Sequence, residues 1–203
     1  MKDNQGKNRL PKGAARQHIL EVADDLFYHI GIRAVGVDTI VAQAGVAKTT
    51  LYDHFASKDA LIEAYLEGRD HAFWQLVDMT LTKHPDSPRE QLLDLFESIE
   101  AFIAGPECLG CPFLNAVAEF PEPDQPGHGI AVAHKEKLRM WFTELAQAAG
   151  VKAAHQFADQ LMLVLDGAFA SKRVYCSAQS PAMQLKATVQ MLLQAHLALS
   201  EVR

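Results

Sequence analysis

Apolar residues recur at every third or fourth position along most of the chain, the spacing of helices with one buried side. The first such stretch covers residues 13–30, where Ile19, Leu20, Ala23 and Phe27 share a face. No stretch alternates apolar and polar residues as a half-buried strand does, and no segment is repeated. The pattern therefore predicts an all-α protein of about nine helices.

Glycine, proline and capping residues set the expected ends of these helices. Two short helices follow the first one and meet at a corner, and a long fourth helix begins after Ser57 and runs to about Thr82. Ser180 is the expected cap of the last helix, and Pro181 lies in its first turn. The five remaining helices are expected at residues 88–104, 112–120, 128–149, 153–176 and 181–201.

The two short helices have the layout of a helix-turn-helix motif. Asp38 or Thr39 offers a side-chain oxygen to cap the first, and Gly45 stands where a chain leaves a helix in the left-handed conformation. Leu51 and Phe55, four residues apart, give the second helix a buried side. Its other side carries potential hydrogen-bond donors: Lys48, Thr49, Thr50, Tyr52 and His54. This layout is typical of proteins that read DNA, although an ordinary helical corner with a polar surface has the same pattern.

The residues around this corner resemble the TetR family of bacterial transcriptional regulators. The likeness runs without a gap from Arg16 to Leu61 and includes the stretch Leu51-Tyr52-Asp53-His54-Phe55-Ala56-Ser57-Lys58. Two departures are Ala47, where the family usually has a small hydroxyl residue, and Thr49, where it often has Gly or Pro. The expected organisation is a helix-turn-helix DNA-binding domain over residues 1–60 and a helical effector-binding and dimerisation domain over residues 61–203.

Seven side chains are candidates for binding DNA: Thr39, Lys48, Thr49, Thr50, Tyr52, His54 and Lys58. Thr49 and Thr50 begin the second corner helix, where side chains reach base edges, and Lys48 suits a guanine or a phosphate. The other hydroxyl and imidazole groups suit phosphate contacts that fix the register. Lys58 adds a cation to the positive end of the fourth helix. A packing role for the Tyr52 ring stays open, and the family resemblance assigns DNA contacts to the same positions.

The charge distribution permits DNA binding without indicating it. The net charge of −6 divides into +1 over residues 1–60 and −7 over the remainder. Phosphate attraction is local to the contacting face, so an acidic remainder does not exclude it. Five cations precede or open the first helix: Lys2, Lys7, Arg9, Lys12 and Arg16. Residues 1–12 are therefore expected to form a basic arm that either reaches phosphates or is a solvated tail.

Composition indicates a folded protein of the cytoplasm. Hydrophobic residues make up 49% of the chain, which favours a globular fold over disorder. There is no run of about 18 apolar residues, so no membrane span is expected, and the N-terminus lacks the apolar segment of a secretion signal. Three cysteines, an odd number, fit a reducing compartment better than a disulfide framework.

Cys108-Leu109-Gly110-Cys111 forms a C-x-x-C pair ahead of a helix that starts at Pro112. A structural pair in a turn, a thiol sensor and a metal site with His128 or His134 are the three alternatives, and no metal or other cofactor is predicted. The segment 110–114 resembles the Gly-Cys-aliphatic stretch of electrophile-sensing TetR relatives. In those relatives a lysine late in the eighth helix is the partner of the cysteine, and Lys172 lies in the comparable region.

An effector cavity is expected among the helices of the second domain, although each candidate residue equally suits core packing. The candidates are Phe102, Cys111, Phe113, Asn115, Glu119, His134, Trp141, Phe169 and Lys172. The segments 161–165 and 191–193 are apolar nearly all round, which indicates a two-fold four-helix bundle made with a second copy.

These features together predict a homodimeric DNA-binding regulator and not an enzyme. A TetR-type repressor would leave a palindromic double-stranded operator when a small molecule or a thiol-reactive compound acts on the second domain. The alternative is a helical thiol oxidoreductase using Cys108 and Cys111, but the chain lacks the βαβ setting in which such a pair usually works.

Overall fold

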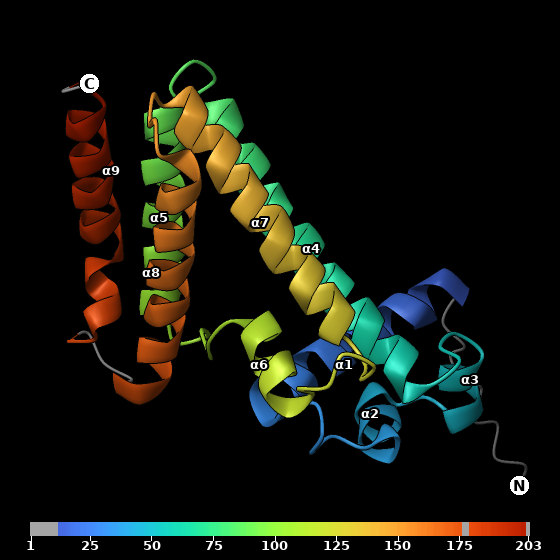
Figure 1. Cartoon of the computed structure of the whole chain (residues 1–203). Helices are drawn as coiled ribbons and strands as arrows, with labels where there is room; N and C mark the ends of the chain where they lie inside the picture. Colours follow the sequence, from blue (N-terminus) through green and yellow to red (C-terminus); the bar gives the residue numbers. More distant parts are fainter. Residues whose placement is uncertain (1–11, 176–178, 202–203) are drawn as a thin grey trace, which may run out of the picture. The chain divides into compact units, whose positions relative to one another are not determined.

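The computed structural model describes residues 12–175 and 179–201, and the regular structure of these residues is entirely helical, with nine α-helices, one 3₁₀ turn and no strand (Figure 1). The all-α fold expected from the periodicity is therefore confirmed. The basic arm expected at residues 1–12 lies outside the described residues except for Lys12, which begins the first helix. None of the described helices is long and apolar enough to cross a membrane.

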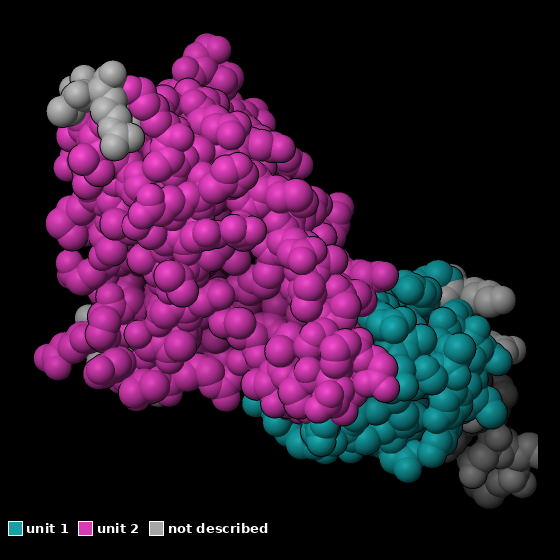
Figure 2. Space-filling model, in the orientation of Figure 1, with its two compact units in different colours: residues 1–65 teal, residues 66–203 magenta. Residues whose placement is uncertain are grey.

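The chain divides into two compact units, residues 1–65 and residues 66–203 (Figure 2). The division falls inside α4 (Lys58–Lys83), five residues beyond the boundary expected at 60/61. Leu61, Ile62 and Tyr65 are buried, and the Tyr65 ring meets Phe27 edge-on at 5.6 Å between centroids. These contacts explain why the first turns of α4 belong to the N-terminal unit.

The N-terminal unit consists of α1 (Lys12–Ile30), α2 (Val37–Ala44), α3 (Lys48–Tyr52) and the start of α4. Its core is formed by one side of each helix, with Ile19, Ala23, Ile40, Leu51 and Phe55 all buried. α1 packs on α2, and α2 packs on α3. Because α3 has only five residues, its position depends on the burial of Leu51 and Phe55 rather than on helix propensity.

The corner between α2 and α3 is built from backbone hydrogen bonds. Gly45 has φ +64, the left-handed conformation expected of it, and the amide of Val46 donates to the carbonyl of Val41 at 3.1 Å. The expected side-chain cap of α2 is wrong: the N-cap is Gly36, and it makes no side-chain cap bond. Ser57 does cap α4, accepting a hydrogen bond from the amide of Ala60 at 3.1 Å.

The C-terminal unit contains the rest of α4 and the remaining helices: α5 (Pro88–Ala104), α6 (Pro112–Glu119), α7 (His128–Ala148), α8 (Ala154–Tyr175) and α9 (Leu185–Glu201). Most ends lie within one residue of the expected ones. The last helix differs, because residues 181–184 form a 3₁₀ turn before α9 begins. Ser180 caps this turn by accepting from the amide of Ala182. The expected end of the eighth helix at Cys176 lies outside the described residues.

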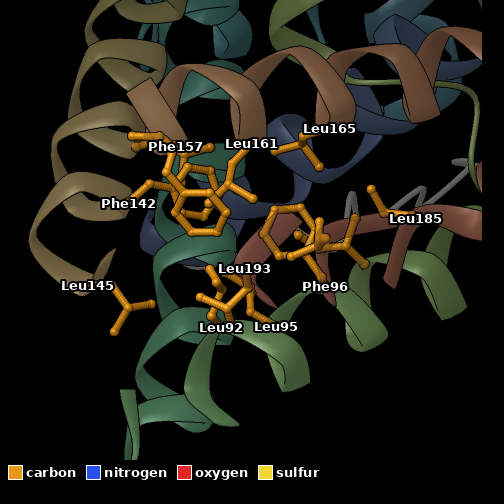
Figure 3. Close-up of a cluster of buried hydrophobic side chains, with 14 of the residues drawn as sticks. Leu92, Leu95, Phe96, Phe142, Leu145, Phe157, Leu161, Leu165, Leu185 and Leu193 are labelled. Carbon is orange, nitrogen blue, oxygen red and sulfur yellow. The ribbon is translucent and has the colours of Figure 1, made fainter. Parts of the chain in front are cut away.

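Helices α5, α7, α8 and α9 enclose the core of this unit (Figure 3). The rings of Phe96 and Phe142 stack with their centroids 5.5 Å apart, and Phe157, Leu161 and Leu193 pack around them. Burial of such side chains contributes about 1.5–3 kcal/mol each to folding. This core fixes α8 and α9, whose outer faces carry exposed apolar residues, among them Leu163 at 75% and Met191 at 63% exposure.

Candidate nucleic-acid interface and ligand cleft

Helix α3 presents hydrogen-bonding side chains on the side opposite its buried residue, Leu51. Lys48, Thr49 and Tyr52 are exposed, the last at 46%, and Thr50 is half-buried. Exposure of the Tyr52 ring leaves its hydroxyl available for a contact outside the unit. Thr39 is exposed on α2, and His54 follows α3 and is half-buried.

Lys48 and Asp38 form an ion pair that links the starts of α3 and α2. The Nζ atom of Lys48 donates to Oδ1 of Asp38 at 2.8 Å. The hydrogen bond to Asp38, reinforced by its charge, raises the pKa of the Lys48 ammonium above its ordinary value. From the sequence Asp38 was expected only as a possible cap, because Lys48 lies ten positions away and on another helix.

Lys58, expected to seat a phosphate, is half-buried and already has protein contacts. Its Nζ atom donates to the carbonyl of Ile32 at 2.6 Å and lies 5.8 Å from the centroid of the Phe27 ring. The lysine therefore ties the start of α4 to the chain after α1. A phosphate contact would have to be made by the same ammonium, which has three N–H donors.

Arg16 was expected to open the first helix and to begin the TetR likeness, but it was not among the candidate DNA-binding residues. Its guanidinium lies over the Phe55 ring, 4.9 Å from the centroid, and its side chain is exposed. Phe55 directly follows the α3 segment, so this contact places a cation on the same unit as the candidate DNA-binding side chains. The sequence predicted that Phe55 is buried, and a buried ring must be covered by side chains of neighbouring elements. Arg16 of α1 is one of the side chains that cover it.

A cleft of about 430 Å³ opens in the C-terminal unit between α6, α8 and the segment before α6. Four of the expected effector-binding residues line it: Cys111, Asn115, Glu119 and Phe169. Five further lining residues were not expected: Gly110, Leu114, Ala118, Ala170 and Arg173. Leu114 and Ala118 lie one helical turn apart on α6, and that spacing relative to Cys111 could have identified them.

Arg173 is held at the cleft by carbonyl oxygens. Its Nη1 atom donates to the carbonyl of Leu109 at 3.0 Å and to Oδ1 of Asn115 at 3.1 Å. The aliphatic part of the side chain crosses Gly110, which has φ +98 and whose missing Cβ would lie 3.2 Å from Cδ of Arg173. Gly110 is therefore required both by the backbone conformation and by the close approach of this arginine.

The other expected effector-binding residues do not line the cleft. The rings of Phe113 and His134 stack at 3.7 Å between centroids, and Nδ1–H of His134 donates to Oδ1 of Asp70 at 2.7 Å. Trp141 packs edge-on against Trp74 at 6.2 Å, and Phe102 is 44% exposed. The rings of Phe113, His134 and Trp141 therefore pack against neighbouring rings, which is the alternative role that the sequence left open for them.

The thiol of Cys111 is buried at the start of α6. Burial raises its pKa, and this effect outweighs the opposing influence of Lys135 and of the amides of Leu114 and Phe113 at the start of α6. Lys172, the expected partner of Cys111, donates from Nζ to the carbonyl of Gly105 at 2.9 Å, and the charged groups that influence the Cys111 thiol are Lys135 and Asp166. The direction is opposite to the lowered pKa that is typical of a reactive cysteine at a helix N-terminus.

Cys108 and Cys111 are both buried, with unpaired thiols. Within the described part of the chain, no three His, Cys, Asp or Glu side chains come together as metal ligands. His128, one of the two histidines considered for a metal, donates from Nδ1 to the carbonyl of Phe120 at 3.0 Å. The arrangement gives the metal alternative no support.

Comparisons with known proteins agree with the helix-turn-helix geometry. The family model for "Bacterial regulatory proteins, tetR family" matches residues 19–65. The transcriptional activator FasR of Mycolicibacterium smegmatis is 42% identical over 64 residues, which are 32% of this chain and 29% of FasR. The transcriptional repressor KstR2 of Rhodococcus jostii is 37% identical over 57 residues, 28% of each protein. This chain thus matches less than a third of either curated relative.

A solved structure matches nearly the whole chain. SCO4454, a TetR-family transcriptional regulator from Streptomyces coelicolor, superposes with a TM-score of 0.83 and is 33% identical. The match covers 90% of this chain and 96% of SCO4454, so it includes both units. Sequence and fold therefore agree over almost the full length, and this chain belongs to the TetR family of transcriptional regulators.

Proposed function

We propose that this chain is a homodimeric, DNA-binding transcriptional repressor that leaves a palindromic operator when a small molecule binds its C-terminal unit. The observation that carries the proposal is the presentation of α3. Leu51 anchors this short helix in the core, while Lys48, Thr49 and Tyr52 are exposed on its other side. A helix anchored and exposed in this way can enter a major groove, and two copies about 34–36 Å apart can enter successive turns of the duplex.

Repression, rather than activation, follows the example of the relative KstR2, while FasR is named an activator. The exposed apolar faces of α8 and α9 support the homodimer, since water-exposed Leu163 and Met191 would be buried by a second copy. The two-fold axis of such a dimer matches the symmetry of a palindromic operator.

The effector site proposed here is the cleft lined by Cys111, Asn115, Glu119, Phe169 and Arg173. Its size suits a small molecule, and its wall combines apolar surface with a few polar groups, as ligand pockets usually do. Non-covalent binding is favoured over thiol modification, because the raised pKa of Cys111 leaves little thiolate at neutral pH.

A chain of contacts leads from this cleft to α4. Phe113 on the cleft-lining helix α6 stacks on His134 of α7, and His134 donates to Asp70 of α4. α4 also contributes its first turns to the N-terminal unit. An effector that binds more tightly when α6 and α4 are displaced would favour the form that does not fit DNA.

The proposal is tested by selecting duplexes from a random pool and measuring the binding of variants to the enriched sequence by gel shift. Tyr52→Phe and Lys58→Ala are expected to weaken binding to all duplexes alike, because phosphate contacts position the protein without reading sequence. Thr49→Ala and Thr50→Ala are expected to change which duplexes are enriched, with about 1–3 kcal/mol of discrimination lost per base contact. Unaltered binding by the Tyr52 and Lys58 variants would remove those two assignments.

A further inference from the structure

The ion pair between Asp38 and Lys48 places a carboxylate on the surface proposed to face DNA. Asp38 is the second residue of α2, and Lys48 is the first residue of α3. Their side chains are 82% and 52% exposed. A pair this exposed contributes about 0–1 kcal/mol to stability, so replacing Asp38 should leave the fold of the N-terminal unit intact.

The pair restricts where the Lys48 ammonium can go. A lysine has a flexible four-carbon stem, and an unpaired one can follow whichever phosphate is nearest. The 2.8 Å bond to Asp38 holds Nζ beside the start of α2. The carboxylate also repels phosphates, so Lys48 brings less net attraction to an arbitrary stretch of DNA than an unpaired lysine would.

We propose that Asp38 determines specificity: it restrains Lys48 from binding phosphates on arbitrary DNA and leaves it able to bind only where an operator presents an acceptor in register. The inference rests on the proposed DNA-binding function. An ammonium has three N–H donors, so Lys48 can bind a base edge or an operator phosphate while it keeps its bond to Asp38.

The proposal gives a quantitative expectation for Asp38→Asn. Non-specific affinity comes from phosphate contacts, and each one contributes about −0.9 to the slope of log K against log salt concentration. Releasing Lys48 should add about one such contact on arbitrary DNA, so the slope becomes steeper by about 0.9 and affinity rises by about 3- to 10-fold near 0.1 M salt. Affinity for the operator should rise less, because Lys48 already contacts it.

The experiment measures the dissociation constants of the full chain for the enriched operator and for a scrambled duplex of equal length, by fluorescence anisotropy over about 50–200 mM salt. The expected result is that Asp38→Asn lowers the ratio of operator to scrambled affinity by about 3-fold or more. Asp38→Glu, which keeps the carboxylate, should restore the wild-type ratio. An unchanged ratio in Asp38→Asn overturns the inference.

Two controls separate this role from a simple change of charge. Asp59 is also exposed and is the second residue of its helix, α4, so Asp59→Asn removes the same charge at the same helical position. Asp59→Asn should leave the ratio unchanged, and an equal effect of both substitutions would overturn the inference. In a Lys48→Ala background, Asp38→Asn should no longer steepen the salt slope.

The outcomes distinguish this inference from the function it rests on. If the wild-type chain binds neither duplex even at low salt, the proposed function fails and this inference fails with it. If the wild-type chain discriminates between the duplexes but Asp38→Asn does not alter the ratio, only the role of Asp38 is overturned. Thermal melting of each variant checks that the fold of the N-terminal unit is retained.

Discussion

His134 is enclosed by aromatic rings and one carboxylate within the C-terminal unit. Phe113 stacks on its imidazole, Phe73 meets it edge-on at 5.2 Å, and Asp70 accepts its Nδ1–H. Burial lowers the pKa of this histidine below its ordinary value, and this effect outweighs the opposing influence of the Asp70 carboxylate. The neutral imidazole is therefore the form that the fold favours, with Nδ1 carrying the proton.

The lowered pKa of His134 predicts how stability depends on pH. Well above pH 6.5, the ordinary histidine value, both folded and unfolded forms are neutral and the group contributes no pH dependence. As the pH falls through 6.5, His134 of the unfolded chain takes up a proton, while His134 of the folded chain stays neutral because its pKa is lower. The free energy of unfolding should therefore fall on acidification, by at most about 1.4 kcal/mol per pH unit from this group.

Urea denaturation of the wild-type chain and of His134→Gln at pH 7.5 and at lower pH values measures this contribution. The variant should lose part of the acid sensitivity, whereas the matched control His71→Gln, at an exposed histidine of α4, should keep it. Equal pH dependence in wild type and His134→Gln would contradict the account of His134.

Residue identities at the cleft could be predicted only in part. Cys111 and Asn115 were among the expected effector-binding residues, and the structure places both in the lining of the cleft. The cation was assigned to Lys172, but its neighbour Arg173 lines the cleft instead. One residue turns a helix by about 100°, so Lys172 and Arg173 bond different parts of the segment before α6, and the sequence does not fix which of the two lines the cleft.

Helix ends were predictable where local chemistry decides them. Gly45 requires the left-handed conformation, Ser57 caps α4, and Pro88 and Ala104 bound α5 as the sequence indicates. The cap of α2 differs from the expected one, because the helix begins at Val37 with Gly36 as its N-cap, so Asp38 lies inside the helix and its carboxylate pairs with Lys48 instead.

Helix α3 lacks a side-chain cap, since its N-cap residue is Ala47. The backbone of Ala47 is extended, with φ −72 and ψ 149, which is the conformation that a capping serine adopts. Ala47→Ser should therefore let a hydroxyl accept a hydrogen bond from the second or third amide of α3. The expected gain is about 0.5–2 kcal/mol in the free energy of unfolding of the N-terminal unit.

Chemical denaturation of the full chain, followed by a probe in the N-terminal unit, measures that gain. Ala47→Val serves as the matched control, because it adds bulk at the same exposed position without an oxygen. A stability for Ala47→Ser no higher than that of wild type would show that the missing cap does not limit α3.

At the scale of the whole molecule, the exposed apolar faces of α8 and α9 bear on assembly. The sequence indicated that segments 161–165 and 191–193 are apolar nearly all round. In the structure Leu161 and Leu165 are buried while Leu163 is 75% exposed. The sequence thus predicted more apolar surface than the unit itself can bury, and the structure shows that Leu163 is one of the side chains left exposed.

A charge on this face should prevent association. Leu163→Glu is expected to yield a folded monomer that loses most operator affinity, because a single half-site offers only part of the contacts. Sedimentation velocity with parallel anisotropy measures both effects. Met140→Glu, on α7 and 60% exposed, is the control that should remain a dimer. A Leu163→Glu variant that stays dimeric would place the interface elsewhere.

The central claim is that the N-terminal unit, used twice, reads double-stranded DNA. The most direct measurement is sequencing of the duplexes that the purified wild-type chain enriches from a random pool. The enriched duplexes should contain an inverted repeat whose half-site centres lie about 10 base pairs apart or at a multiple of that spacing. Enrichment of no sequence, together with no measurable affinity for duplex DNA at low salt, would contradict it.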